Sequence, residues 1–360
     1  MARLGKGIYK RSDGRYEGRY RKGRNSDGSL LYGHVYAKTA AETQVKLSAV
    51  SANLSLRITN AATISSTLRD YLTFIQSQVK LSTHSVYTRY LDKYIEPLLG
   101  SVRISKLTQA NVQSFADTQI NNGLSARTVQ SVISFLRAGL AEHIPAQTFT
   151  VKLPKHVARE THVLSCVEQS QLEAVLRAVD PINRVGITLC LYTGIRIGEL
   201  CGLKWEDIDF VTGSLHIRRT IERIKTETVS AKTQLVIQTP KSDTSVRCIP
   251  LPQFLLDLLL EHKRGNSGDY VITLNGKPLD PRTVQKRFKR ILELAKLRDI
   301  NFHAATRHTF ATRALENGVD IKTLSEILGH SNAAFTMNFY AHSVDAHKRE
   351  CMEAVATVRR

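Results

Sequence analysis

Seven polar residues in the C-terminal half of the chain are of the types that can break and rejoin a phosphodiester bond. In chain order they are Arg196, Glu199, Lys241, His303, Arg307, His330 and Tyr340. A phosphodiester gains negative charge on its two non-bridging oxygens during displacement, and a planar guanidinium offers paired donors that match this geometry. Two arginines can therefore stabilise the transition state in the way that two metal ions do in other enzymes.

Tyr340 is the candidate nucleophile. Its ordinary pKa of about 10 makes the phenolate unfavourable by roughly 4 kcal/mol at pH 7, so a base or nearby cations must assist it. His303 is the expected base because an ordinary imidazole pKa lies near the working pH, and Lys241 in a mobile hairpin is the expected acid for the leaving 5′-oxygen. We expect His330 to donate to the phosphate. The expected product is a 3′-phosphotyrosyl link and a free 5′-hydroxyl, which can rejoin without a nucleotide cofactor.

Local signals indicate how these side chains are positioned. Arg196 follows the helix-breaking pair Thr193-Gly194 and opens a helical run, so its head group is expected at a helix entrance, where anions are favoured. Glu199 lies three residues on, on the same face, and can hold Arg196 in place. Two assignments keep rivals: Lys225 and Lys232 compete with Lys241, and His308 competes with His303.

The strings TGIRIGEL (193–200), TPKSDTSVRCIP (239–250), FHAATRHTFAT (302–312), LGHSN (328–332) and FYAH (339–342) resemble the tyrosine recombinases, the integrases of phages and transposons. The resemblance spans roughly 165 to 345 and departs at one point. In the family the catalytic histidine lies three residues before the second arginine, where this chain has Ala304, and His303 lies four before Arg307. Both spacings keep the two side chains on one helix face, so His303 is retained, the alternatives being His308 or a lost base.

Composition favours a polyanionic partner. The chain has 51 Lys plus Arg against 32 Asp plus Glu, a net charge of +19, and its pI is about 9.8. Such a balance drives DNA binding through counterion release, although a ribosome-associated protein would share it. The five cysteines lack paired or metal-like spacing, which is typical of reduced thiols. With neither a signal peptide nor a long apolar stretch, we expect a cytoplasmic, nucleoid-associated protein with no membrane contact and no metal.

Residues 1–58 are expected to form a first domain. The stretch Arg15–Arg21 alternates charged and small or aromatic residues, as a strand does, and predicts a three-stranded sheet followed by a helix that Thr39 and Glu42 open with a capping box and that ends near Leu56. The expected DNA-binding residues here are Arg15, Arg19, Arg21 and Lys22. The segment resembles the arm-type DNA-binding domain of some integrases, and the alternative is a flexible basic tail.

Residues 60–150 show helical periodicity in four amphipathic stretches and are expected to form a small bundle. By resemblance this is the core-binding domain that clamps DNA, and its expected contacts are Lys80, Thr83, Arg89 and Arg127. A plain packing module is the alternative. Residues 144–161, with two prolines and several basic residues, are expected to be a linker.

Residues 162–360 are expected to form the mixed α/β catalytic domain. Ser165 to Glu168 predicts a capping box, Asp180-Pro181 and Asp280-Pro281 predict further helix starts, and Asn275-Gly276 predicts a tight turn. The whole chain is thus expected to be mainly α with small antiparallel β-sheets. The resemblance implies that a final helix within 344–358 docks on a neighbouring subunit of a synaptic tetramer.

The sequence therefore predicts an integrase-type recombinase of a mobile element or prophage. Its expected partners are double-stranded DNA at core and arm sites, three further copies of itself, a DNA-bending accessory protein and an excisionase. The alternatives are a recombinase that resolves chromosomes or plasmids, and a non-catalytic DNA-binding regulator on a decayed recombinase fold.

Overall fold

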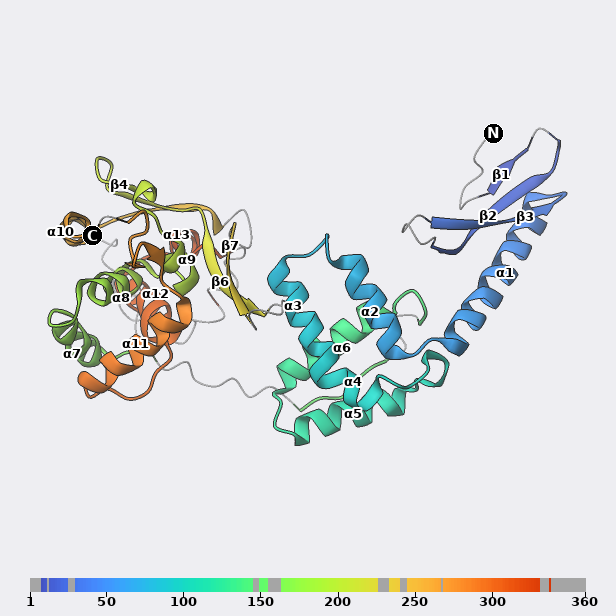
Figure 1. Cartoon of the computed structure of the whole chain (residues 1–360), viewed down its shortest axis with the longest axis horizontal. Coiled ribbons are helices and arrows are strands. Elements are labelled where there is room, and N and C mark those ends of the chain that lie inside the picture. Colours follow the sequence, from blue (N-terminus) through green and yellow to red (C-terminus); the bar gives the residue numbers. More distant parts are fainter. Residues whose placement is uncertain are drawn as a thin grey trace, which may run out of the picture. The chain divides into compact units, whose positions relative to one another are not determined.

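The computed structural model describes residues 8–11, 13–24, 30–144, 149–154, 163–225, 233–239, 245–266, 268–330 and 337, leaving the side chains of 21–24, 30–31 and 51–61 undescribed. The chain divides into two compact units, Met1–Val157 and Ala158–Arg360, and each is considered by itself (Figure 1). The first two predicted domains both fall within the first unit.

The N-terminal unit begins with the predicted antiparallel sheet. Its strands β1 (Ile8–Lys10), β2 (Tyr16–Arg24) and β3 (Leu30–Ala37) pair in that order and are followed by helix α1 (Ala40–Ala61). The backbone N–H of Glu42 donates to the Thr39 hydroxyl at the start of α1, which is one of the two bonds of the predicted capping box. The helix extends to Ala61, past the predicted end near Leu56. Gly18 of β2 lies against Thr43 and Leu47 of α1, so one face of the sheet packs on the helix. The charged face of the alternation is left on the other side.

A helical bundle fills the rest of this unit. Its elements are α2 (Ile64–Ile75), α3 (Leu81–Tyr90), the π-helical η1 (Leu91–Ile95), α4 (Glu96–Leu99), the short η2 (Ile104–Lys106), α5 (Gln109–Asn121) and α6 (Ala126–Leu140). The apolar residues at helical spacing form its core, with Leu68, Ile95 and Ile133 fully buried. The prediction that residues 144–161 form a linker is partly wrong, because Phe149 is buried in this core and only 4% exposed. Burial of that aromatic ring holds residues 149–154 against the bundle.

The C-terminal unit is mostly helical (Figure 1). Its helices are α7 (Cys166–Leu176), α8 (Pro181–Thr193), α9 (Ile197–Gly202), η4 (Trp205–Asp207), α10 (Gln253–Arg264), α11 (Pro281–Leu294), the π-helical η6 (Ala304–His308), α12 (Thr309–Glu316) and α13 (Ile321–Leu328). Its strands are β4 (Ile208–Asp209), β5 (Ser214–Ile217), β6 (Thr220–Lys225), β7 (Thr233–Gln238), β8 (Arg247–Pro250), β9 (Thr273–Leu274) and β10 (Lys277–Pro278).

These strands form small antiparallel sheets, β4-β5-β8, β6-β7 and β9-β10. The predicted helix starts at Ser165, Asp180 and Asp280 are confirmed, since each side chain caps its helix. One buried apolar core joins α7, α8, α10 and α11. The predicted fold class, mainly α with small antiparallel sheets, is confirmed. Among the described helices, none combines the length and the apolar character that crossing a bilayer requires.

Candidate active site

Three helix ends meet around the predicted arginines. Helices α8 and α13 are each followed by a glycine C-cap, Gly194 and Gly329, whose backbones are in the left-handed region with φ of 64° and 63°. Helix α9 begins directly after Arg196. A Cβ at Gly194 would lie 2.6 Å from the Phe310 ring, so glycine is required there both for its backbone angle and for space. The carbonyls exposed at these two helix ends become acceptors for the arginines.

Glu199 is the centre of the ion-pair network. Its carboxylate is 3% exposed and accepts from Arg196 twice, from the backbone N–H at 2.9 Å and from Nη1 at 2.8 Å. Burial raises the pKa of Glu199, but hydrogen bonding to Arg247 and the charges of Arg247 and Arg196 outweigh it and hold that pKa below its ordinary value. Glu199 is therefore ionised and fixes Arg196 as the sequence predicts.

Arg247 is the site residue that the sequence analysis missed. Its Nη1 and Nη2 donate to the Glu199 carboxylate at 3.2 Å and 2.9 Å, and its Nε donates to the Ile327 carbonyl at 2.6 Å. Its side chain is only 5% exposed. A charged residue opening a short apolar strand was the available signal, but nothing in the sequence pairs it with Glu199, 48 residues away.

Arg307 is buried, with 2% of its surface exposed. Its Nη1 donates to the Gly194 carbonyl and its Nη2 to the Leu328 carbonyl, each at 2.7 Å. These bonds anchor the guanidinium between the ends of α8 and α13. Since Arg196 also donates to the Gly329 carbonyl at 3.4 Å, both predicted arginines reach the same helix end.

His330 lies beside Arg307, with Nε2 2.7 Å from Arg307 Nη2. The guanidinium can only donate, so Nε2 accepts and a neutral His330 carries its proton on Nδ1. Partial burial and the charges of Arg307, Arg196 and Arg247 lower the pKa of His330 to about 3. The Nδ1–H group is then the hydrogen-bond donor of this ring.

His303 faces the same charges but differs from its sequence-based expectation in one respect. Partial burial, His308 and the guanidinium groups of Arg307 and Arg196 lower its pKa to about 4, not near the working pH as expected. Desolvation is the largest cause and the nearby charges add to it, and the linear sequence displays neither. His303 Nδ1 lies 3.0 Å from His308 Nε2, so the rival histidine is its hydrogen-bonding partner.

Two predicted catalytic residues, Lys241 and Tyr340, lie outside the described residues, as does the rival Lys232. Lys225, the other rival, ends strand β6. The structure therefore brings together Arg196, Glu199, His303, Arg307 and His330, and adds Arg247 and His308. It does not address the positions of the expected nucleophile and acid.

The predicted DNA-binding residues of the N-terminal sheet flank a buried acid. Glu17 is 2% exposed and accepts from Arg11, Arg19 and His34, and these bonds lower its pKa to about 2 despite burial. Arg19 also lies over the Tyr9 ring, 5.0 Å from its centroid, and remains 45% exposed. The result is a surface of ordered cations and aromatic rings. Arg15 pairs with Asp13, while the side chains of Arg21 and Lys22 are not described.

The bundle residues Lys80, Arg89 and Arg127 are exposed, and Thr83 is half-buried. Lys80 directly precedes α3, Thr83 and Arg89 lie on it, and Arg127 lies in the first turn of α6. Helices α3 and α6 pack together through the stacked rings of Tyr87 and Phe135, whose centroids are 4.9 Å apart. Their exposure is compatible with the predicted DNA contacts.

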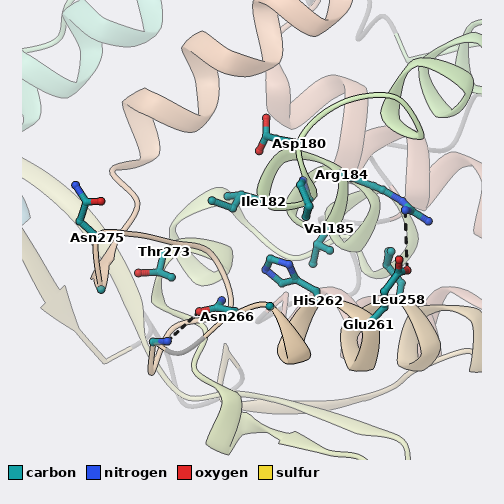
Figure 2. Close-up of a pocket in the computed structure, with 14 residues that line it drawn as sticks. Asp180, Ile182, Arg184, Val185, Leu258, Glu261, His262, Asn266, Thr273 and Asn275 are labelled. Carbon is teal, nitrogen blue, oxygen red and sulfur yellow. Dashed lines mark hydrogen bonds and ion pairs between the residues drawn. The ribbon is translucent and has the colours of Figure 1, made fainter.

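A surface pocket of about 550 Å³ lies elsewhere in the C-terminal unit, between the start of α8, the end of α10 and the β9-β10 hairpin (Figure 2). Asp180 at one wall and the arginine cluster lie at opposite ends of α8, about 20 Å apart along its axis. Arg184 faces Glu261 across the pocket at 4.0 Å, and the buried His262 bonds the Val271 carbonyl. The pocket holds none of the predicted catalytic residues.

In the described part of the chain, no group of three or more His, Cys, Asp or Glu side chains is placed to hold a metal ion. The fixed positive groups around Glu199 are the guanidinium groups of Arg196 and Arg247, and neutral histidines lie nearby. Such an arrangement can bind a phosphate and stabilise the charge that develops on it.

Comparison with known proteins points to one family. Residues 165–347 match the model of the phage integrase family, and residues 63–118 match the phage integrase N-terminal SAM-like domain. The chain is 28% identical to a tyrosine recombinase XerC-like protein of Caldanaerobacter subterraneus, over 92% of this chain and 93% of that protein. It is 30% identical to tyrosine recombinase XerC of Alcanivorax borkumensis, over 77% and 89% of the two chains.

Solved structures share the fold. The Tn1549 transposon integrase in complex with circular intermediate DNA aligns with a TM-score of 0.69 at 23% identity, covering 82% of this chain and all of that one. A lambda integrase tetramer bound to a Holliday junction aligns with a TM-score of 0.57 at 20% identity, covering 92% and 97%.

Proposed function

This chain belongs to the phage integrase family of tyrosine recombinases, and from that premise we propose that Tyr340 attacks DNA within the arginine cluster around Glu199. Enzymes of this family cleave and rejoin DNA, and the chain is a site-specific DNA recombinase. The assignment of each role to a residue is the proposal.

The observation that carries the proposal is the convergence of Arg196 and Arg307 on one helix end. Both guanidinium groups donate to carbonyls at the C-terminal end of α13, Gly329 for Arg196 and Leu328 for Arg307. Two fixed guanidinium groups form a preorganised cradle for a phosphate, and a preorganised cradle needs little rearrangement as charge develops. His330 adds an Nδ1–H donor beside Arg307. The scissile phosphate is proposed to bind here.

His303 is proposed as the base despite its one-residue offset. The segment from Ala304 to His308 is π-helical, and a π turn holds about one residue more than an α turn. The extra residue between His303 and Arg307 is thereby absorbed. The low pKa keeps His303 neutral at pH 7 and able to accept the Tyr340 proton, while an incoming phosphate anion raises that pKa. Lys241 is proposed to protonate the leaving 5′-oxygen.

A mobile element or prophage is the proposed setting. The alignment with a XerA relative spans 81% of this chain and 95% of that protein, and the alignment with a XerC relative spans 77% and 89%, so about a fifth of this chain lies outside each alignment. The XerC-like protein of Caldanaerobacter subterraneus, aligned over 92% of this chain, shares most of that additional length. The sheet from β1 to β3 with its ordered cations accounts for much of the surplus and is suited to arm sites. The alternative of a resolution recombinase rests on those same relatives' names.

The assembly of this chain on DNA is proposed from one of its structural neighbours. The lambda integrase neighbour is described as a tetramer bound to a Holliday junction. We propose a tetramer on DNA for this chain, with 162–360 as the catalytic domain and 60–150 as the core-binding domain. A DNA-bending protein, an excisionase and residence at the nucleoid belong to the same proposal.

A covalent-adduct assay tests the function. The full chain is incubated with nicked duplexes carrying randomised sequence, because a nick lets the cleaved strand diffuse away and traps the intermediate. Adducts that survive denaturant are isolated, and their DNA is sequenced, which also identifies the site. We expect adducts from the wild type and none from Tyr340→Phe. Sequence-specific binding without adducts would instead support a regulator on a decayed recombinase fold.

A further inference from the structure

We propose that His308 is a positioning residue that fixes the tautomer of His303, so that His303 Nε2 presents a lone pair to the reaction. The inference rests on the proposed function of His303 as the base. It starts from the contact between the two rings: His303 Nδ1 and His308 Nε2 are 3.0 Å apart, and the rings meet edge to face at 75° with centroids 4.5 Å apart.

The π-helical turn is what makes this contact possible. The two histidines are five residues apart, and on an α-helix such residues are separated by about 140° and do not face each other. In a π turn the hydrogen bonds run from residue i to i+5, so residues five apart lie one above the other. His303 directly precedes η6 and His308 ends it. The inserted residue therefore keeps both histidines on one face.

Partial burial, together with the surrounding charges, keeps both rings neutral. Partial burial and the Arg307 guanidinium lower the pKa of His308 to about 4, and Arg196 and Arg307 act likewise on His303. Between two neutral imidazoles, one nitrogen of the contact must donate and the other accept. We assign the proton to His303 Nδ1, donating to His308 Nε2.

This assignment has a chemical consequence. With its proton on Nδ1, His303 has its lone pair on Nε2, the atom that then takes the proton from Tyr340 Oη as that oxygen attacks phosphorus. The resulting imidazolium keeps its Nδ1–H bond to His308, which shares the new positive charge. The opposite tautomer would leave His303 Nε2 protonated and unable to act as a base.

Imidazole nitrogen NMR on the full chain tests the tautomer without DNA. Protein labelled with ¹⁵N-histidine is measured at pH 7.5, and the His303→Ala spectrum identifies the His303 signals. We expect the His303 proton on Nδ1. Among the variants, His308→Gln places an amide near the former Nε2 and should keep this tautomer, whereas the shorter His308→Asn should lose it. A wild-type proton on Nε2, or an unchanged tautomer in His308→Asn, overturns the proposal.

Single-turnover cleavage tests the consequence, on the nicked duplex from which Tyr340-dependent adducts are recovered. We expect His308→Asn to slow cleavage by about tenfold to a hundredfold, part of the contribution of a general base, and His308→Gln to stay within about threefold of wild type. In a His303→Ala background, His308→Asn should have no further effect. A full additional loss there would mean that His308 acts structurally and not through His303.

The two measurements separate the failure of this inference from that of the proposed function. If the wild type forms no adduct, the function fails, while the tautomer experiment still decides the histidine pair. If adducts form and require Tyr340 but His308→Asn cleaves at the wild-type rate, the function stands and the role of His308 is rejected. Thermal melting of each variant confirms that it is folded.

Discussion

At the scale of single residues, Glu199 organises the site although it does not belong to the reacting set. Its two oxygens accept from both Arg196 and Arg247, and the carboxylate and the Arg247 side chain are buried. A buried carboxylate with so many cationic donors stays ionised and holds them in fixed directions. Arg196 is therefore held in position by Glu199.

The contribution of the Glu199 ion pairs to stability can be measured by replacing Arg247, the partner that the sequence analysis missed. Arg247→Met keeps most of the side-chain volume but leaves Glu199 buried with Arg196 as its remaining ion-pair partner. We expect the free energy of unfolding to fall by about 3 kcal/mol, the usual cost of breaking a buried pair from one side. Urea denaturation monitored by circular dichroism gives this value.

A matched surface pair provides the control for that variant. Arg298 pairs with Glu168 at 2.9 Å but is 42% exposed. Arg298→Met should therefore cost less than about 1 kcal/mol. Equal losses in the two variants would contradict the view that burial makes Glu199 the critical carboxylate.

The depressed histidine pKa values predict that acid destabilises the catalytic unit. The pKa values of His303 and His308 are lowered to about 4 and that of His330 to about 3, against 6.5 for ordinary histidine. Between these values the unfolded chain binds more protons than the folded one, so stability is full above pH 6.5 and declines as pH falls toward 4. Urea midpoints at pH 7.5 and 5 measure the loss.

A histidine variant identifies the source of this pH dependence. Because His330→Asn removes one of the three groups, its urea midpoint should differ less between the two pH values than that of the wild type. An unchanged difference would assign the acid sensitivity to other groups.

At the scale of elements, the segment Ala304–His308 illustrates what the sequence could and could not specify. The one-residue offset of His303 is visible in the sequence, and the helical structure assumed around it is present. The π turn that resolves the offset was not predictable, because π-helical geometry depends on how the flanking residues pack and has no propensity signature of its own. Here Ala304, Ala305 and Arg307 are all buried, so packing determines the turn.

Deleting one residue tests whether the π turn absorbs an insertion. Ala304 and Ala305 are adjacent and identical, so removing either gives the same protein, in which histidine lies three before arginine. We expect the segment to become α-helical, the protein to stay folded, and cleavage of the nicked duplex to remain within about tenfold of wild type. Inserting a third alanine after Ala305 should instead reduce the cleavage rate by at least about a hundredfold, because a further residue rotates the base away from Arg307.

At the scale of the whole molecule, the parts that were predicted follow from local rules. The capping residues Ser165, Asp180 and Asp280, and the turn at Asn275-Gly276 with positive φ at both positions, are set by a few neighbouring residues. Arg247 and the bundle-bound Phe149 were missed because each acquires its role from a distant partner. Contacts made by tertiary packing leave no periodic trace in the sequence.

Charge also acts at the scale of the molecule. We expect the arginines of the N-terminal sheet to account for a defined share of the salt dependence of DNA binding. With a net charge of +19, non-specific DNA binding should weaken steeply with salt. Replacing Arg15, Arg19 and Arg21 together by glutamine should reduce the slope of log K against log salt by up to about 3, close to one unit for each phosphate that the variant no longer neutralises. Glutamine is chosen because it can still donate to Glu17.

A second triple variant with the same change in net charge serves as the control. It distinguishes the effect of phosphate contacts made by the sheet from the effect of total charge on the salt dependence. Arg177, Lys263 and Arg264 are exposed on or directly after helices of the C-terminal unit, near α7 and α10. Their replacement by glutamine lowers the net charge by the same 3 and should leave the slope nearly unchanged, measured by fluorescence anisotropy on a random duplex. Equal slopes for the two triple variants would mean that Arg15, Arg19 and Arg21 do not bind phosphates.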